Sequence, residues 1–289
     1  MQQEPRLPFD LERYIFEFAA FEDPQLIHTL VLVAHRVSAW IEPLRFQVVR
    51  LNNSPPAIQF FRLVRNGTKP PAYFAANVKH ILLEHMVFRE NRDIQRIVRM
   101  CTGVTDLGTT YRFNSPAFLD IFGALPRLER LTIDLCALFT FRRTRVRIDP
   151  RHAALARVTH LTLHDRIGER ETRARVCAAL PDMPALTHVR LMLPDLQDGL
   201  PELEVLLERL PRLEVMLLSG VQDAREDSPD QEVVRDVRLV VVGGWPSYDK
   251  FWAEWEAAAR GGDCLWIKAE DFVRRKREGR LDRKEIWLL

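Results

Sequence analysis

The chain has 289 residues, 47% of them hydrophobic and 28% charged, a composition that excludes intrinsic disorder and allows a large buried core. Its 42 basic and 40 acidic residues leave a net charge of +2, which gives no long-range attraction to nucleic-acid phosphates. The four cysteines are widely separated, the first twenty residues are too charged for a signal peptide, and no apolar run approaches the roughly 20 residues of a membrane helix. We expect a cytoplasmic or nuclear protein without cofactors that binds neither nucleic acid nor membrane.

The segment 7–46 has the pattern of short amphipathic helices. Asp23 and Pro24 form a helix start signal, with an N-cap side chain followed by proline at the first helical position. Pro43 marks the end of the segment. The apolar positions that share a helical face are Leu11, Ile15 and Phe18 in the first helix, and Leu26, Leu30, Val33 and Val37 in the second.

This segment resembles an F-box. The resemblance rests on Leu7-Pro8-x-Asp10-Leu11, Ile15-Phe16, Asp23-Pro24 and the sequence LVLVAHRVSAW from Leu30 to Trp40, in the order and approximate spacing of that three-helix motif. In F-box proteins the motif docks on a Skp-family adaptor of SCF ubiquitin ligases, while the rest of the chain captures a substrate. The resemblance thus implies an adaptor-binding surface formed or supported by Leu7, Pro8, Leu11, Ile15, Phe16, Val33, Val37 and Trp40. The whole chain also resembles F-box-like proteins of mushroom-forming fungi, which often end in a Trp-rich stretch.

A domain of about 40 residues rarely has enough core to fold alone. The apolar surplus of segment 7–46 must therefore pack on the rest of the chain, on a partner, or on both. The alternative to adaptor docking is that these helices only cap the first unit of a repeat array.

A pattern apolar-x-x-apolar-x-apolar recurs seven times after this segment, with its starts 26, 24, 30, 28, 27 and 21 residues apart. Leucine-rich repeats have units of about 20–29 residues. Segments with helical spacing separate the copies, so we predict an α/β fold: a leucine-rich-repeat-like curved solenoid of about seven parallel strands with outer helices. The seven copies begin at Val78, Val104, Leu128, Val158, Leu186, Leu213 and Val234. The usual asparagine after the last apolar position is missing, which predicts an irregular array; a doubly wound sheet is the alternative.

The strand alternation places one row of polar side chains on the face opposite the helices. Solenoids present this face as a concave surface, so we predict target binding there. The residues are His80, Asp106, Arg130, Thr132, His160, Thr162, His164, His188 and Arg190. His160 and His188 occupy equivalent positions on neighbouring strands and could bind a metal or sense pH. No third ligand is evident, so we expect partner binding rather than a metal site.

Five of the six tryptophans lie in residues 245–289, for which we predict a helical cap over the end of the array; a tryptophan-based partner site is the alternative. The basic run 274–280 fits a solvated helix face, or a nuclear signal.

No motif of nucleophilic, phosphate-binding or metal-dependent catalysis is present, so no enzyme is expected. The predicted domains are an F-box-like helical module (1–50), an irregular leucine-rich-type array (51–244) and the Trp-rich cap (245–289). The expected function is the substrate-recognition adaptor of an SCF-type ubiquitin ligase, which binds a Skp-family adaptor and an unknown target protein. The alternative is a free-standing repeat scaffold for protein–protein interaction.

Overall fold

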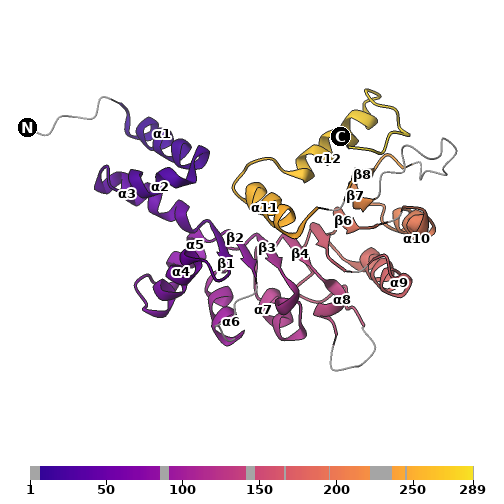
Figure 1. Ribbon diagram of the computed structural model, residues 1–289, viewed down its shortest axis with the longest axis horizontal. Helices are drawn as coiled ribbons and strands as arrows, with labels where there is room; N and C mark the ends of the chain where they lie inside the picture. Colours follow the sequence, from indigo (N-terminus) through magenta and orange to yellow (C-terminus); the bar gives the residue numbers. More distant parts are fainter. Residues whose placement is uncertain are drawn as a thin grey trace, which may run out of the picture.

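A computed structural model describes residues 7–84, 91–140, 147–165, 167–194, 196–221, 236–244 and 246–288. Its centre is one sheet of eight parallel strands whose spatial order follows the chain without reversal (Figure 1). The strands are β1 (Val48–Leu51), β2 (His80–Leu83), β3 (Asp106–Thr109), β4 (Arg130–Ile133), β5 (His160–Leu163), β6 (His188–Met192), β7 (Val215–Val221) and β8 (Leu239–Gly243). The α/β class and the repeat-like parallel arrangement are therefore confirmed, and the unreversed order excludes the doubly wound alternative.

Helices lie on both sides of this curved sheet. Those between the strands cover its outer face, and the last two lie on its inner face (Figure 1). The helices after β1 are α4 (Pro55–Arg65), α5 (Pro71–Asn77), α6 (Asn91–Met100), α7 (Leu119–Gly123), α8 (Leu135–Leu138), α9 (Arg170–Ala179), α10 (Leu196–Arg209), α11 (Tyr248–Ala259) and α12 (Leu265–Arg277). Short 3₁₀ turns η3 (Tyr111–Phe113), η4 (Pro116–Phe118) and η5 (Leu180–Asp182) join some of them. Among the described residues, no helix has the length and apolar character needed to span a membrane.

The main core lies between the sheet and the outer helices. Alternate strand residues point to opposite faces, so the last two apolar positions of each repeat, such as Ile81 and Leu83, enter this core together. The predicted helical stripes meet them from the other side, as Ile94 and Ile97 of α6 do. Because equivalent positions pair across neighbouring strands, the core runs continuously along the array.

Strand β1 was not predicted, and it crosses the expected domain boundary at residue 50. It pairs in register with β2, so the sheet begins before the first recognised repeat. The other strands coincide with the seven predicted repeats; Val234, which starts the last one, lies outside the described residues, as does Trp245.

The amino-terminal segment forms α1 (Phe9–Glu22), η1 (Pro24–Leu26), α2 (Ile27–Leu30), α3 (His35–Ile41) and η2 (Glu42–Phe46). As predicted, Asp23 caps the start at Pro24: its carboxylate accepts a hydrogen bond from the backbone N–H of Gln25. Ala20, Ile27, Val37 and Ile41 form a small buried core of their own. Phe46 joins this segment to the array by packing against Phe60 and Tyr73.

The Trp-rich helices lie on the inner face of the sheet rather than over its end, which corrects the expected cap. Trp252 of α11 packs with Leu82 and Met192, and Phe272 of α12 packs with Val215 and other residues of β7 and β8. The segment around Trp287 lies along the edge of β8, where it forms a parallel bridge with Val241. The basic run is also not simply a solvated face, because Lys276 is fully buried and donates hydrogen bonds to backbone carbonyls, including that of Leu239.

Candidate interaction surfaces

The amino-terminal helices carry most of the strongly exposed large apolar side chains of the described residues. Thirteen such side chains are exposed in the described part of the chain, and ten of these lie between residues 7 and 33. The ten are Leu7, Phe9, Leu11, Tyr14, Ile15, Phe18, Phe21, Leu26, Leu32 and Val33. Clusters of exposed apolar side chains of this kind are rare on monomers and typical of interaction surfaces, so this is the candidate partner surface.

The residues predicted to bind an adaptor are not all on this surface. Leu7, Pro8, Leu11, Ile15 and Val33 are exposed. The other three residues of that set instead hold the helices together: Val37 is fully buried, Phe16 packs on the small core, and Trp40 meets the ring of Phe9 edge to face at 4.9 Å. Their predicted role can thus be only to support the surface, because side chains at an amphipathic helix interface face the core.

The prediction of an open, target-binding concave face is wrong in its central premise, because α11 and α12 cover that face. Of the nine residues predicted there, only Arg130 is exposed. Buried residues are Asp106, Thr132, Thr162, His188 and Arg190, and half-buried ones are His80, His160 and His164. The space left between sheet and helices near Arg130 is about 40 Å³, room for about one water molecule.

Polar side chains of the sheet hold α11 in place. Arg190 on β6 donates hydrogen bonds to Glu254 of α11 at 3.0 Å and to Ser219 at 2.9 Å, and it lies 5.0 Å from the centre of the Phe251 ring. Burial lowers the pKa of Arg190, and the nearby Glu254 opposes that effect. Arg190 of the predicted polar row therefore binds a segment of the same chain.

Burial lowers the pKa of three histidines of the inner face, His160, His164 and His188. His160 and His188 stack face to face with ring centroids 4.0 Å apart, as their equivalent positions on β5 and β6 predict. Burial lowers the pKa of His160 to about 3, with help from His188 and Arg130, and lowers that of His188 as well. Burial, with the charge of Arg190, lowers the pKa of His164 to about 4.

A groove of about 550 Å³ lies along β1, the first strand of the sheet. It is bounded by α4, by the end of α11 and by the amino-terminal helices, whose Arg45 and His28 reach it. Within the described residues β1 pairs only with β2, so its other edge faces this groove. An unpaired strand edge presents backbone donors and acceptors to any extended chain placed beside it.

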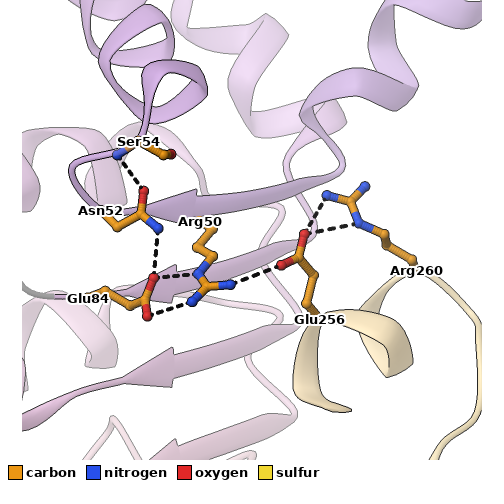
Figure 2. Close-up of polar contacts among 6 residues, drawn as sticks. All are labelled: Arg50, Asn52, Ser54, Glu84, Glu256 and Arg260. Carbon is orange, nitrogen blue, oxygen red and sulfur yellow. Dashed lines mark hydrogen bonds and ion pairs between the residues drawn. The ribbon is translucent and has the colours of Figure 1, made fainter. Parts of the chain in front are cut away.

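A network of charged side chains forms one wall of this groove (Figure 2). Arg50 of β1 makes two hydrogen bonds to the carboxylate of Glu84, and its third nitrogen lies 3.4 Å from Glu256 of α11. Glu256 in turn accepts from Arg260, 2.9 Å away, and Asn52 donates to Glu84 at the same distance. The hydrogen bonds with Glu84 raise the pKa of Arg50, so this cation is permanent. The network fixes the end of α11 beside β1.

None of Arg50, Glu84, Glu256 and Arg260 was predicted as a site residue. Three of them come from segments more than 30 residues apart, so no local spacing brings them together. A partial signal existed for β1: Phe46, Val49 and Leu51 fit the apolar-x-x-apolar-x-apolar pattern of the later strands.

Compared with known proteins, the chain matches no protein-family model, and no curated protein is significantly similar to it in sequence. The class that fold and surfaces define is a repeat-like parallel α/β protein with an amino-terminal helical module that bears an exposed apolar surface.

Proposed function

We propose that this protein is the substrate-recognition adaptor of an SCF-type ubiquitin ligase and is not itself an enzyme. Its amino-terminal helices would dock on a Skp-family adaptor, and the array would hold a target protein. A chain that binds the adaptor and the target at the same time holds them close together. This raises the effective concentration of the target at the ligase. A role of this kind places the protein in the cytoplasm or nucleus.

The observation that carries this proposal is the concentration of exposed apolar side chains on residues 7–33. A helical cap that served only the array would bury such residues against the first repeat. Here the contact with the array runs mainly through η2 instead, where Phe46 packs on Phe60 and Glu42 pairs with Lys69. Leu11 and Ile15 stay about half exposed, at 52% and 50%. The F-box resemblance supplies the identity of the partner.

The target surface in this proposal is the groove along β1, because the inner face is already filled. Three arginines, Arg45, Arg50 and Arg260, line the groove; Glu84 and Glu256 pair with Arg50 and Arg260, so the net positive charge is that of Arg45. This balance favours an extended target segment that carries acidic side chains and pairs its backbone with the open edge of β1.

The adaptor contact can be tested by measuring the affinity of the full chain for a purified Skp-family adaptor. We expect micromolar or tighter binding by the wild type, and at least a tenfold loss for Leu11→Asp and Ile15→Asp, because a charge would then have to be buried in an apolar contact. These variants should fold, since both side chains are half exposed. Ile267→Asp is the matched control, because Ile267 on α12 is 64% exposed and lies outside the amino-terminal module.

Failure of the wild type to bind the adaptor would overturn the ligase role and leave the free-standing scaffold as the better account. Equal binding by wild type and Leu11→Asp would show that the exposed apolar surface is not the docking site.

The target groove requires a separate experiment with synthetic peptides. We expect an acidic peptide library to bind the wild type more tightly than the same library with amides in place of carboxylates. Arg45→Glu should remove that preference, because Arg45 is exposed and, within the described residues, hydrogen-bonds to neutral Gln59 and to no carboxylate. No difference between the two libraries would exclude an acidic target at this groove.

A further inference from the structure

Three potential ligand atoms meet where α12 crosses the inner face of the sheet. The Nε2 atoms of His160 on β5 and His188 on β6 lie 3.8 Å and 3.4 Å from the same carboxylate oxygen of Glu270 on α12. All three atoms lie within 4.8 Å of one another. Since β5 and β6 pair in register at His160 and His188, the sheet itself fixes the separation of the two rings.

The hydrogen bonds on the far side of each ring set its tautomer. Nδ1 of His160 lies 2.9 Å from the hydroxyl of Thr159, and Nδ1 of His188 lies 2.8 Å from that of Thr187. Each hydroxyl donates its own proton to a backbone carbonyl, that of Glu129 or of Thr159. With the hydroxyl proton on that carbonyl, the hydroxyl oxygen accepts from an Nδ1–H, and the Nε2 atom of each ring is then the one with a lone pair that can bind a metal ion. A second partner that fixes the tautomer in this way is typical of metal-binding histidines.

The Nε2 atom of His188 is buried and makes no hydrogen bond, although the carboxylate is near. The side chain of His188 is only 7% exposed. A buried polar atom without a partner is unfavourable unless some group satisfies it. Two imidazole nitrogens and a carboxylate oxygen within 4.8 Å of one another are the ligand types of a transition-metal site.

We propose that His160, His188 and Glu270 form a binding site for a divalent transition-metal ion of the zinc type, which fastens α12 to β5 and β6. Zinc–nitrogen distances of about 2.0–2.1 Å in a tetrahedral site put ligand atoms roughly 3.4 Å apart. The two nitrogen–oxygen distances of 3.4 Å and 3.8 Å fit this requirement. The stacked rings, inclined by only 7°, must tilt toward each other to aim both lone pairs at one ion. Imidazole ligands favour zinc over calcium or magnesium.

Neighbouring charges act in both directions on this site. Arg130 of β4 is a nearby cation, and its charge disfavours a bound metal ion. Glu214 is a nearby carboxylate, and its negative charge favours one. Trp266 closes one side, with its ring edge-on to both imidazoles at 5.4 Å and 5.7 Å. The remaining coordination position is left for water.

The test uses the tag-free full chain, treated with a chelator and titrated with zinc chloride alone in a calorimeter at pH 7.5. We expect one equivalent to bind, the thermal midpoint to rise with zinc, and Glu270→Gln to weaken the affinity at least tenfold. Glu270 is half exposed, at 47%, so this variant should fold. Asp271→Asn is the matched control, because Asp271 is the next residue of α12 and pairs with Arg274; it should bind zinc as the wild type does.

Cobalt(II) supplies a second readout. A nitrogen–oxygen site gives visible ligand-field absorption without the intense near-ultraviolet band of thiolate ligands, and His188→Asn should abolish that absorption. Equal zinc affinity of the wild type and Glu270→Gln would overturn the proposal. So would a thiolate band, which would place the ion on cysteines instead.

Discussion

Gly108 on β3 lies directly beneath Trp252 on α11. A Cβ atom at Gly108 would come within 2.9 Å of the Trp252 ring and 3.3 Å of the Trp255 ring. Trp255 is held here by its indole N–H, which donates to the carboxylate of Asp106 at 3.2 Å. The close approach of α11 to the sheet therefore depends on the absence of a side chain at one strand position.

We predict that Gly108→Val destabilises the protein by about 1–3 kcal/mol, because the added methyl groups overpack the contact with Trp252. Urea unfolding followed by tryptophan fluorescence measures this directly. Gly243→Ala is the control, since its Cβ would meet only the Trp287 ring at an ordinary 3.7 Å. An unchanged unfolding midpoint for Gly108→Val would show that α11 does not rest on the sheet in solution.

The ion pair between Arg190 and Glu254 predicts a strongly non-additive double-mutant cycle. Glu254→Ala should cost about 2–4 kcal/mol, because it leaves the buried guanidinium of Arg190 without its carboxylate. Arg190→Leu/Glu254→Ala should be more stable than Glu254→Ala alone, since the uncompensated charge is then gone. Chemical denaturation of the three variants gives the coupling. Additive effects would contradict this account of how α11 is held.

Local periodicity was enough to predict seven of the eight strands and the two faces of the sheet. The alternation around Leu161 and Leu163 assigns the helix-side face, and the 28-residue interval between repeats places His160 beside His188. These features depend on neighbours in sequence or on equivalent positions in adjacent repeats, so a single sequence encodes them.

The covering of the inner face could not be predicted in the same way, because it joins positions such as Asp106 and Trp255 that are 149 residues apart. No periodicity specifies which surface a helix will meet. The sequence held one partial signal, the pairing of a very small residue with very large ones. Gly108 lies in the middle of a strand, where glycine often marks the close approach of another segment, and the tryptophans that could fill that space fall in one late segment. Glu270 had no signal at all.

His164 predicts a loss of stability in mild acid. Its pKa is lowered to about 4 in the folded protein, against about 6.5 when unfolded, so the unfolded state binds the proton first. The stabilising contribution is present above pH 6.5 and is lost as the pH falls toward 4. Between pH 7.5 and 5 this amounts to about 2 kcal/mol. Stability measured across that range should fall less steeply in His164→Leu. Parallel curves for both proteins would contradict the prediction, and His35→Leu is the exposed control.

Asp165 takes over part of the role of the asparagine that the repeats lack. It is 2% exposed, and its two carboxylate oxygens each accept a backbone N–H at 2.6 Å, from Leu135 and Cys136 in the preceding unit. Burial, reinforced by the charge of Asp134, raises the pKa of Asp165 to about 7 despite these bonds. The carboxyl group is therefore both a structural acceptor and a group that titrates near neutral pH.

Asp165→Asn should destabilise the protein by about 1–3 kcal/mol at pH 8, because an amide offers one acceptor oxygen and turns its NH₂ toward the other backbone donor. Amide hydrogen exchange at Leu135 and Cys136 should quicken in the variant, whereas Asp149→Asn, which alters an exposed turn bond to Arg151, should leave it unchanged.

The raised pKa of Asp165 sets the sign of the pH effect. The stability that the protonated acid contributes to the folded protein is complete below about pH 4 and is lost as the pH rises through 7. The amide of Asp165→Asn does not titrate, so only the wild type loses this stability as the pH rises. The difference in stability between wild type and variant should therefore be smaller at pH 8 than at pH 5. A constant difference across that range would mean that Asp165 does not titrate there.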